Sequence, residues 1–479
     1  MVNPKQVMVL GGGTAGLVSS LILNKMFNVD ITIIKSNEIG IIGVGEGSTE
    51  HWNEFLNYSE IDYKELIKET DATVKLGVYF TNGWSKHNYY HNIGCIKSEL
   101  KLSQINYGIL KSFSSNEDPI RTSCYLNLNN LVPNETNKSV SNQYHFNTFK
   151  LNNFLIKKCL ERGIKIVDDT IVDVSLDDNG IKSIRGVKDY FADFYIDCTG
   201  FKRVLISKLN AKWISYSSYL TMNEAIAFPT EDTDEYTPYT EAKRTIGGWM
   251  WRIPTFGRWG NGHVFNSNLI NADKAKEIAE KTLGHAVEVA KHVKFNPGAL
   301  DRCLIKNCLA VGLSANFVEP LEATSIGTTI NQMFLFNHYF PHVSNDFYSN
   351  EYNTKINDIM DNIRDFVLIH YLNDKEVLFP SSLKEKLKLW KVRPPIQEDF
   401  SNNSYYLFNS RNFTQVLCGT DFYNANEIKN YLKSYNSRLT LTADLEITHK
   451  ELEYVNNKHN HISHKKWLDN IRSMNNGNI

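Results

Sequence analysis

A glycine-rich turn near the N-terminus constrains the fold of this chain more than any other feature. The apolar run Gln6–Leu10 leads into Gly11-Gly12-Gly13-Thr14-Ala15-Gly16, and a helical pattern of apolar residues follows. In this strand–turn–helix context, Gly11 makes the tight turn, Gly13 lets the backbone approach a pyrophosphate, and Gly16 lets the helix pack on the strand. The phosphates would lie at the helix N-terminus, beside Thr14 and Ala15, where free N–H groups favour an anion. The pattern predicts a dinucleotide-binding parallel sheet.

Two later segments repeat the strand-then-glycine pattern. Ala192–Gly200 is typical of a strand that ends in a turn of small residues, and Asn307–Leu313 repeats it with Gly312 and Leu313 at the turn. Three such units over about 300 residues indicate a nucleotide-binding sheet interrupted by a long insertion. Large FAD proteins have this arrangement, whereas simple NAD dehydrogenases do not need it.

The strand expected at Asp30–Ile34 departs from the usual dinucleotide pattern at its end. An acidic residue usually stands there and binds the adenosine ribose, but this chain has Lys35-Ser36. Ser36 or Glu38 is a candidate to replace that contact, and Lys35 is a candidate to meet a phosphate.

Composition excludes several classes of function. The chain of 479 residues has 52 Lys plus Arg against 53 Asp plus Glu, so no strong net charge points to nucleic acid or an anionic membrane. No apolar run is long enough to span a bilayer. The seven cysteines are scattered without CxxC spacing, so neither a metal site nor a disulfide framework is expected. Met1–Lys5 carries no secretory-signal pattern. Because the cysteines suggest no disulfides, we expect a reduced, cytoplasmic setting.

The segment Trp249-Met250-Trp251-Arg252-Ile253-Pro254 is unusual for an ordinary core. Two indoles one residue apart project to the same face of an extended strand. Pro254 is expected to stop that strand from continuing as a central sheet element. The segment fits a hydrophobic strand end with two buried tryptophans, and it also fits a stiff aromatic wall beside a reactive cofactor. The residues alone leave both interpretations open.

Two further segments are rich in glycine and hydroxyl groups. Gly43–Thr49, with Gly45 and Glu46 at its centre, suits a loop that passes close to a ring system, and equally a surface turn. In Glu319–Gly327, residues Thr324, Ser325 and Gly327 offer hydroxyl and N–H groups to a small anion at the start of a helix. Thr324 or Ser325 alternatively caps that helix. Both interpretations of the second segment hold together, because an unfilled cap is itself an anion site.

Taken together, the Gly11–Gly16, Gly43–Thr49, Trp249–Pro254 and Phe317–Gly327 segments resemble the flavin-dependent halogenases, especially those that act on tryptophan. The resemblance runs from about residue 5 to about residue 420, and W-x-W-x-I-P is its most specific motif. It implies an α/β fold: an FAD-binding Rossmann-like core of the flavin monooxygenase type, a β-rich insertion and a mainly helical C-terminal region. We expect the core with its insertion (211–295) to occupy 1–345, and a helical substrate-side region with a polar tail to occupy 346–479.

The resemblance implies a role for each matching residue. The residues assigned to FAD are Gly11, Gly13, Thr14, Ala15, Gly16, Ser36, Gly45, Glu46, Gly312, Leu313 and Gly327. Halide is assigned to Thr324 and Ser325, where Ser325 replaces the family's usual glycine. The separation of the flavin from the substrate is assigned to Trp249, Trp251 and Pro254.

Two residues are expected to do the chemistry. The family's essential lysine lies on a helix after the glycine loop, and Lys75 matches it, with Val74 in place of the usual aromatic residue. Glu322 matches the active-site carboxylate, which accepts the proton that a substituted ring loses. Reduced FAD (FADH2), O2 and a halide (chloride, bromide or iodide) would yield hypohalous acid, which passes to Lys75 for electrophilic halogenation of a small electron-rich aromatic of the indole or phenol type.

The substrate and partners are less determined by these motifs. His91 and Ile93 are expected on the substrate side, and Ile93 replaces an aromatic residue of the tryptophan-specific enzymes. No separate NAD(P)H fingerprint is found, so a separate flavin reductase is expected. The tail histidines are expected in a solvated segment rather than at a metal; they are His449, His459, His461 and His464. Alternatives are an FAD-dependent monooxygenase that hydroxylates a small aromatic and a catalytically lapsed flavin-binding protein. The oligomeric state stays open, with a homo-oligomer among the options.

Overall fold

The computed structural model describes residues 4–43, 47–93, 109–110, 113, 121–134, 143–343, 345–433, 450 and 452–474, without the side chains of 121–124. The chain forms two compact units, each assembled from three segments. Unit 1 comprises Met1–Thr70, Phe146–Ser217 and Phe295–Asn362, and unit 2 comprises Asp71–His145, Ser218–Lys294 and Ile363–Ile479. The division into residues 1–345 and 346–479 expected from the sequence stays a prediction.

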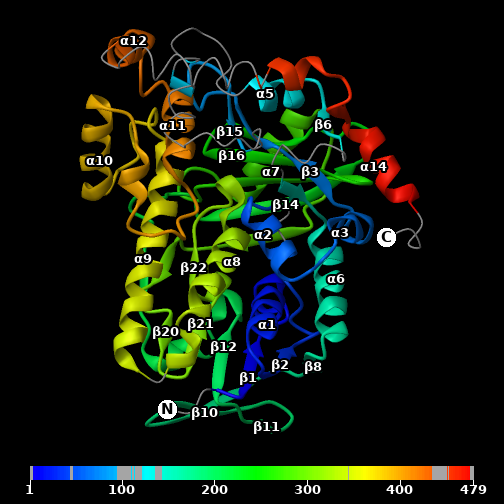
Figure 1. The fold of residues 1–479 in the computed structure, drawn as a ribbon, viewed down its shortest axis with the longest axis vertical. Coiled ribbons are helices and arrows are strands. Elements are labelled where there is room, and N and C mark those ends of the chain that lie inside the picture. The colour runs from blue at the N-terminus through cyan, green and yellow to red at the C-terminus, as the bar shows by residue number, and fades with distance from the viewer. Residues whose placement is uncertain are drawn as a thin grey trace. The chain divides into compact units, whose positions relative to one another are not determined.

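Unit 1 is built on a six-stranded sheet in the order β20-β21-β12-β1-β2-β8, and β1 lies in its interior (Figure 1). All its pairings are parallel except that of β20 with β21. The strands are β1 (Gln6–Leu10), β2 (Asp30–Lys35), β8 (Lys165–Asp168), β12 (Phe194–Asp197), β20 (Leu304–Ile305) and β21 (Cys308–Ala310). The expected Rossmann-like core is therefore confirmed.

Helices cover this sheet because its central strands are apolar throughout. Val7–Leu10 of β1 are all buried, as a parallel strand covered on both faces requires. Helix α1 packs against β1 and β2 and also contacts α6 and α8. The helices of unit 1 are α1 (Thr14–Met26), α2 (His51–Tyr58), α3 (Tyr63–Thr70), α6 (Thr148–Glu161) and α8 (Thr324–Asn337).

Two small sheets complete unit 1, in the orders β11-β10-β9 and β13-β19-β22. The first contains β9 (Asp173–Asp177), β10 (Gly180–Arg185) and β11 (Asp189–Tyr190). The second contains β13 (Trp213–Ser215), β19 (Gly298–Leu300) and β22 (Asn316–Phe317).

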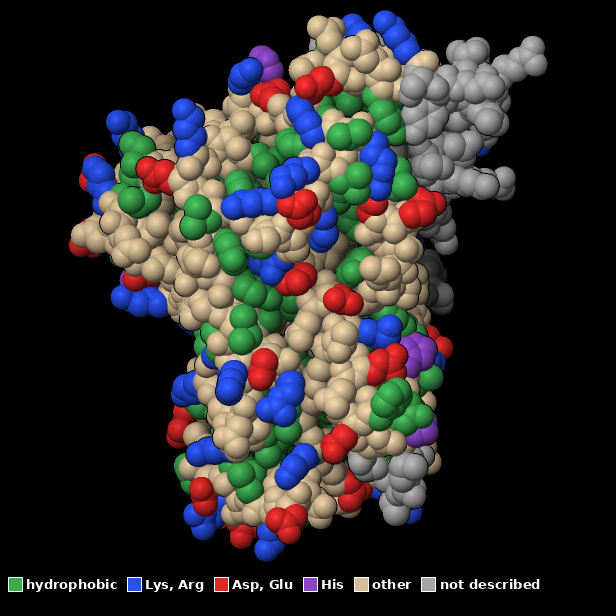
Figure 2. Space-filling view, turned by 90° about the vertical axis from the view of Figure 1, so that its left-hand side faces the viewer, with side chains coloured by type: hydrophobic (Ala, Val, Ile, Leu, Met, Phe, Trp, Pro, Cys, Tyr) green, Lys and Arg blue, Asp and Glu red, His purple; other side chains and the backbone are tan. Residues whose placement is uncertain are grey.

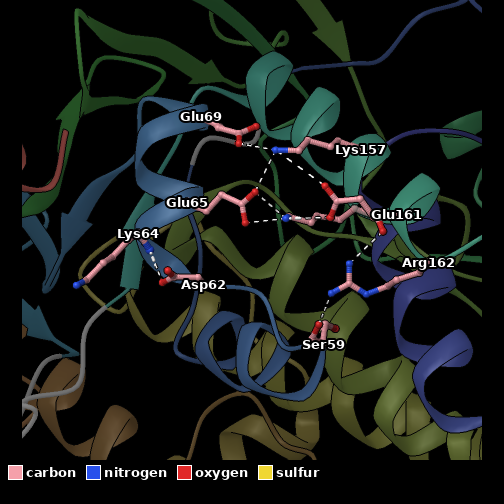
Figure 3. Close-up of polar contacts among 9 residues, drawn as sticks. Ser59, Asp62, Lys64, Glu65, Glu69, Lys157, Glu161 and Arg162 are labelled. Carbon is pink, nitrogen blue, oxygen red and sulfur yellow. Dashed lines mark hydrogen bonds and ion pairs between the residues drawn. The ribbon is translucent and has the colours of Figure 1, made fainter. Parts of the chain in front are cut away.

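A network of ion pairs joins α3 to α6 within unit 1 (Figure 3). Lys157 Nζ lies 2.7 Å from Glu69 and 3.0 Å from Glu65, and Lys158 Nζ lies 2.6 Å from Glu65. The Lys158 side chain is only 9% exposed, so its pair with Glu65 is partly shielded from solvent. Burial opposes ionisation of Glu65, but hydrogen bonds from Lys158 and Lys157 outweigh it and lower the pKa of that carboxyl.

Unit 2 is built on a seven-stranded sheet in the order β18-β14-β17-β16-β15-β4-β5. Only the pairing of β15 with β4 is parallel among these strands. The strands are β4 (Gly77–Thr81), β5 (Tyr89–Asn92), β14 (Glu224–Glu231), β15 (Tyr239–Thr245), β16 (Gly248–Thr255), β17 (Arg258–Phe265) and β18 (Lys291–Lys294). Helix α7 (Ala272–Leu283) packs on one face, where Met250 and Phe265 are buried.

Strand β16 stops being a central sheet element at Pro254, as expected, although the strand itself runs one residue further. Strand β16 continues through Pro254 to Thr255 and pairs with β17 along its whole length, from Gly248↔Phe265 to Thr255↔Arg258. On its other side, pairing with β15 reaches only Arg252↔Glu241. Pro254 is tolerated because it lies beyond the last residue that β15 pairs, so its missing N–H breaks no ladder on that side.

The remaining elements of unit 2 are short strands and helices. Two-stranded pairings join β3 (Thr73–Lys75) to β7 (Gln143–His145) and β6 (Leu131–Pro133) to β23 (His461–Ser463). The helices are α5 (Arg121–Leu128), α10 (Ser381–Val392), α11 (Ser410–Gly419), α12 (Ala425–Lys433) and α14 (His464–Ser473). With α9 (Asp346–Ile369), they confirm the expected mainly helical C-terminal region.

The surface carries both signs of charge. On the face drawn in Figure 2, Lys and Arg side chains are interspersed with Asp and Glu side chains, in keeping with the near-zero net charge of the sequence. Within the described residues, no helix is both long and apolar enough to cross a membrane.

We predict that Glu65→Gln lowers the free energy of unfolding by about 1 kcal/mol, because it removes the charge that Lys157 and Lys158 share. The matched control is Glu277→Gln, which disrupts the exposed pair of Lys274 and Glu277 on α7 and should change stability by less than about 0.5 kcal/mol. Chemical denaturation of both variants measures the difference. Equal effects would show that the network contributes no more than a surface pair.

Candidate functional site

Two glycines of the first turn are required by backbone packing. Gly11 adopts φ 120°, and a Cβ atom there would overlap the carbonyl oxygen of Cys198 at the end of β12. A Cβ atom on Gly16 would overlap the carbonyl oxygen of Gly11. The first glycine therefore permits the tight turn, and the second lets α1 lie close to β1.

Gly13 differs from Gly11 and Gly16, because open space surrounds it. A Cβ atom on Gly13 would have no other atom within 4 Å. This residue is the N-cap of α1, and no side chain caps the helix there. The first turn of α1 therefore presents backbone N–H groups that are not satisfied by a side-chain cap, next to space that glycine leaves free. That combination fits an anionic pyrophosphate.

The turn after β21 lies against the same end of α1. Gly312 begins the 3-10 helix η3 (Gly312–Ser314) with φ 65°, and a Cβ atom there would lie 2.6 Å from Cβ of Ala15. The structure thus brings together Ala15, Gly312 and Leu313, which are about 300 residues apart in the sequence.

The end of β2 is held by contacts within the protein. Ser36 Oγ lies 2.7 Å from Thr170 Oγ1 and also accepts a hydrogen bond from the N–H of Ile39. Lys35 is paired with Asp168 of β8, and the Asp168 carboxylate accepts the N–H of Asn37 at 2.9 Å. Sequence reasoning missed Asp168, because a pairing of β8 with β2 has no local signal.

Asp197, at the end of β12, is a second residue that sequence reasoning missed. It is fully buried and accepts hydrogen bonds from the N–H groups of Leu205 and Ile206 at 2.8 and 2.9 Å. It also accepts the hydroxyls of Thr199 and Ser314 at 2.6 and 3.1 Å. This carboxylate therefore fixes the turns after β12 and β21 relative to each other.

A strained turn precedes α8. Glu322 and Ala323 adopt left-handed backbone conformations, with φ 68° and 54°, although neither is glycine. Such conformations cost about 1–2 kcal/mol each, and they are concentrated at functional sites. They place the Glu322 side chain, 4% exposed, directly before the first turn of the helix.

Thr324 and Ser325 form the first turn of α8 and do not cap it. The N-cap position belongs to Ala323, and no side chain caps the helix. The carbonyls of Thr324 and Ser325 accept the hydroxyls of Thr328 and Thr329 at 2.8 and 3.0 Å. This helix start, next to two hydroxyl side chains, suits a small anion.

Gly327 lies against the loop that follows the 43–49 segment. A Cβ atom on Gly327 would overlap Oγ1 of Thr49, which itself lies 3.1 Å from Nδ1 of His51. The close approach explains why glycine occupies this position on α8. The expected cofactor residues Gly45 and Glu46 lie outside the described residues.

In unit 2, Lys75 is fully buried at the end of strand β3. The helix that the resemblance implied at this position is wrong for this chain. The β-branched residues Thr73 and Val74 favour an extended backbone, and β3 pairs with β7 in the register Thr73↔His145 and Lys75↔Gln143. Burial also excludes a lysine that extends along the surface into solvent.

Hydrogen bonds join the lysine strand to the W-x-W-x-I-P strand. The Thr73 hydroxyl donates to the carbonyl of Pro254 at 2.6 Å. The N–H of Phe256 donates to the carbonyl of Asp71 at 2.9 Å. The structure therefore joins the end of the tryptophan motif to the strand that carries Lys75, although the two segments are about 180 residues apart in the sequence.

The two indoles project from the same face of β16, as the strand period predicts. Trp249 and Trp251 are 2% and 6% exposed, and their ring centroids lie 6.2 Å apart with a 58° tilt. Trp84 continues the row, 6.3 Å from Trp249. A Cβ atom on Gly262 would overlap the Trp251 ring, so glycine in β17 makes room for that indole.

The two expected substrate-side residues lie on the other side of the lysine segment. The N–H of Ile93 donates to the carbonyl of Leu76, the residue after Lys75, at 2.9 Å. His91 is buried, and its Nε2 accepts the amide of Asn412 on α11 at 3.1 Å. Unit 2 thus brings together Lys75, the tryptophan strand and the 91–93 segment.

The expectation of a solvated tail was wrong for His464. His459 is exposed, but His464 is 1% exposed and its imidazole contacts β3. Burial lowers the pKa of His464 to about 4, against the opposing effect of its bond to the Tyr236 carbonyl. The pKa of His145 is also held well below its ordinary value, by burial first and then by the positive charge of Lys75. Among the described residues, no cluster has the composition of a metal site.

Comparison with known proteins agrees with this arrangement. The family model for tryptophan halogenase matches residues 6–433, which is most of the chain. The chain belongs to the tryptophan halogenase family. It is accordingly a flavin-dependent halogenase, an oxidoreductase.

Individual members of the halogenase family are similar over nearly the whole chain. Tryptophan 6-halogenase SttH of Streptomyces toxytricini is 29% identical, covering 87% of this chain and 90% of its own length. Tryptophan 7-halogenase RebH of Lentzea aerocolonigenes is 27% identical, covering 86% of this chain and 89% of its own length. The crystal structure of SttH superposes with a TM-score of 0.87 at 25% identity, covering 98% of this chain and 100% of that chain.

We predict opposite outcomes for two substitutions in the first turn. Gly16→Ala should lower the free energy of unfolding by about 2 kcal/mol, because the new Cβ overlaps backbone. Gly13→Val should leave the apoprotein's stability within about 0.5 kcal/mol, since its φ of −77° suits any residue, yet weaken FAD binding. Thermal unfolding without flavin and a flavin fluorescence titration measure the two effects. Wild-type FAD affinity in Gly13→Val would contradict a pyrophosphate at this position.

We predict that the free energy of unfolding decreases as pH is lowered from about 6.5 to about 4, because of His464. Its folded-state pKa of about 4 lies below the ordinary value of 6.5, so the unfolded chain binds a proton here that the folded protein does not. The resulting loss in the free energy of unfolding is zero above pH 6.5 and reaches about 3 kcal/mol as pH falls to about 4. Below about pH 4 the loss stays constant. His464→Gln should flatten this part of the profile. Parallel profiles for both proteins would contradict the assignment.

Proposed function

We propose that the protein is an FADH2-dependent halogenase that makes hypohalous acid from O2 and a halide and uses Lys75 to transfer the halogen to a small electron-rich aromatic. The observation that carries the proposal is the burial of Lys75 on a strand hydrogen-bonded to the W-x-W-x-I-P segment. A lysine without solvent contact is costly to bury and is therefore a candidate for chemistry.

The residues of unit 1 fit the flavin. The open space at Gly13 and the uncapped start of α1 suit the pyrophosphate, and Ala15, Gly312 and Leu313 line the adjoining turn. When bound in its reduced form, FAD supplies the two electrons with which O2 is reduced while a halide is oxidised to hypohalous acid. Thr14, Ser36, Gly45 and Glu46 belong to the same proposal.

The first turn of α8 is the proposed halide position. Thr324 and Ser325 offer hydroxyl and backbone N–H groups at a helix start that no side chain caps. A halide anion there gains from the positive end of the helix dipole. Glu322, held by the left-handed turn, is the proposed acceptor of the proton that the substituted ring releases.

Lys75 is the proposed transfer residue of unit 2. Its amino group would hold the hypohalous acid by hydrogen bonding, or as a haloamine, and direct the electrophilic halogen to one position of the ring. Trp249 and Trp251 form an apolar row on β16, the strand whose Pro254 is bonded to Thr73 of the lysine strand, and we propose that they keep the substrate away from the flavin. Such a partition explains why halogenation rather than hydroxylation is the outcome.

The substrate is proposed as an indole or phenol. SttH and RebH are tryptophan halogenases by name, so tryptophan is the first compound to test. Ile93 stands where tryptophan-specific enzymes carry an aromatic residue, so free indoles and phenols belong in the same panel. A separate flavin reductase is the proposed source of reduced flavin.

We predict halogenated product when the protein is supplied with FAD, a flavin reductase, NADH and each halide, and is tested by mass spectrometry on a panel of phenols and indoles including tryptophan. Bromide and iodide should support more product than chloride, because heavier halides are easier to oxidise. Lys75→Met, which keeps an unbranched side chain in the buried site, should lose at least about 100-fold of product while hypohalous acid, detected by a chemical trap, persists. Gly13→Val is the control, because it should lose both products.

Three outcomes would contradict parts of this proposal. Hydroxylated product would indicate a monooxygenase, and no product with any compound or halide would indicate a lapsed flavin-binding protein. Wild-type product yield in Lys75→Met would exclude the transfer role and indicate free hypohalous acid as the halogenating agent.

A further inference from the structure

The C-terminal segment of the described chain is attached to unit 2 beside the lysine strand. Strand β23 pairs with β6 in an antiparallel register, and α14 begins directly after it. His464, the first residue of α14, is 1% exposed, whereas the next two residues, Lys465 and Lys466, are exposed. A polar side chain that is buried at a helix start needs a specific partner to offset its desolvation.

His464 has a partner on each ring nitrogen. The backbone N–H of Val74 donates to Nε2 at 2.9 Å, and Nδ1 lies 2.9 Å from the carbonyl oxygen of Tyr236. A carbonyl only accepts and an amide N–H only donates, so the proton resides on Nδ1 and the ring is neutral. A second proton on Nε2 would face the Val74 N–H and break that bond.

This bond holds the lysine strand from the side that β7 does not pair. Val74 is the central residue of β3, between Thr73 and Lys75. Its N–H goes to an imidazole 390 positions away in the chain, and the N–H of Leu76, two residues further on, donates to the carbonyl of Pro238 at 2.6 Å. A strand of three residues with one paired neighbour is held weakly by itself, so these contacts fix its position.

The titratable groups near His464 explain why a neutral imidazole is a suitable acceptor for the Val74 N–H. Among the described residues, the titratable groups near His464 include His145, which interacts electrostatically with both Lys75 and His464, and Tyr236, whose ring centroid lies 6.2 Å from that of the imidazole. Two ion pairs lie at the edge of the same helix, Lys465 with Asp234 at 3.0 Å and Arg472 with Asp71 at 3.6 Å. A cation in place of the neutral ring would add a second positive charge beside His145, which already interacts with Lys75, whereas a neutral ring holds the backbone without that cost.

We propose that His464 is a positioning residue for Lys75: its neutral imidazole holds β3 through the Val74 amide, which makes the C-terminal segment part of the lysine site. The role in halogen transfer rests on the proposed function, whereas the holding of β3 does not. Removing the Val74 contact frees the strand, so the amino group samples more positions and transfers the halogen less often.

The test compares two amides of similar polarity. His464→Gln carries an acceptor at the distance of Nε2 and should keep the Val74 bond, whereas His464→Asn reaches only the Nδ1 position and should lose it. Both keep a polar group at a buried site, so the comparison stands even if an apolar substitution fails to fold. His459→Gln, at an exposed residue of the same tail, is the control.

Hydrogen–deuterium exchange of a peptide covering residues 71–77 reports on β3, and the rate at which acetic anhydride modifies Lys75, read by mass spectrometry, reports on its amino group. In His464→Asn both rates should rise about 3- to 10-fold, as expected for the loss of one hydrogen bond. Both should stay within about 2-fold of wild type in His464→Gln and His459→Gln. Unchanged rates in His464→Asn, or equal increases in Gln and Asn, would overturn the proposal.

Measurements of bromination distinguish the positioning role of His464 from the proposed halogenase function. With bromide and the panel compound that the wild-type enzyme brominates fastest, His464→Asn should lower brominated product per trapped hypobromous acid by about 10-fold, with FAD affinity unchanged. An unchanged ratio despite faster exchange would overturn the link to Lys75. If the wild-type protein brominates nothing, the proposed function fails, and the exchange and labelling rates still decide whether His464 holds the strand.

Discussion

Burial of the Lys75 amino group is the constraint on which the arrangement of unit 2 depends. A lysine with no solvent contact has lost its hydration, and only fixed protein groups can replace it. The strand that carries it is three residues long, so its position comes from partners elsewhere in the chain. Pro254 accepts the Thr73 hydroxyl, and His464 accepts the Val74 amide. Burial and the charge of Lys75 both lower the pKa of His145, because a second cation nearby would raise the cost of the first.

Unit 1 depends on a different constraint. Backbone segments approach each other closely at the first glycine turn, and open space remains beside that turn. Gly11 and Gly16 are required because a side chain would overlap a carbonyl oxygen, whereas Gly13 is next to open space. The strained pair Glu322 and Ala323 is a second backbone constraint of unit 1, because its left-handed conformations set the direction of the Glu322 side chain and the start of α8. Two glycines required by packing and one beside open space thus stand in a single turn.

Local patterns predicted what depends on local geometry. The apolar run before Gly11 predicted a buried parallel strand, and the spacing of Trp249 and Trp251 predicted that both indoles share a face. Pro254 correctly marked the point where β16 is no longer a central strand, because β15 stops short of it and only β17 still pairs there. The helix expected at Lys75 and the solvated tail expected at His464 failed because both positions are decided by partners far away in the chain.

By itself, the sequence determined the class of core, the glycine turn and the tryptophan face, because strand period and glycine conformation are properties of a few consecutive residues. Only the tertiary structure decided that Lys75 is a buried strand residue, that Thr73 and Pro254 are bonded, and that His464 belongs to the lysine site. The physical reason is that burial and hydrogen-bond partners are pairwise properties. Residues separated by about 180 and 390 positions acquire them only when the chain has folded.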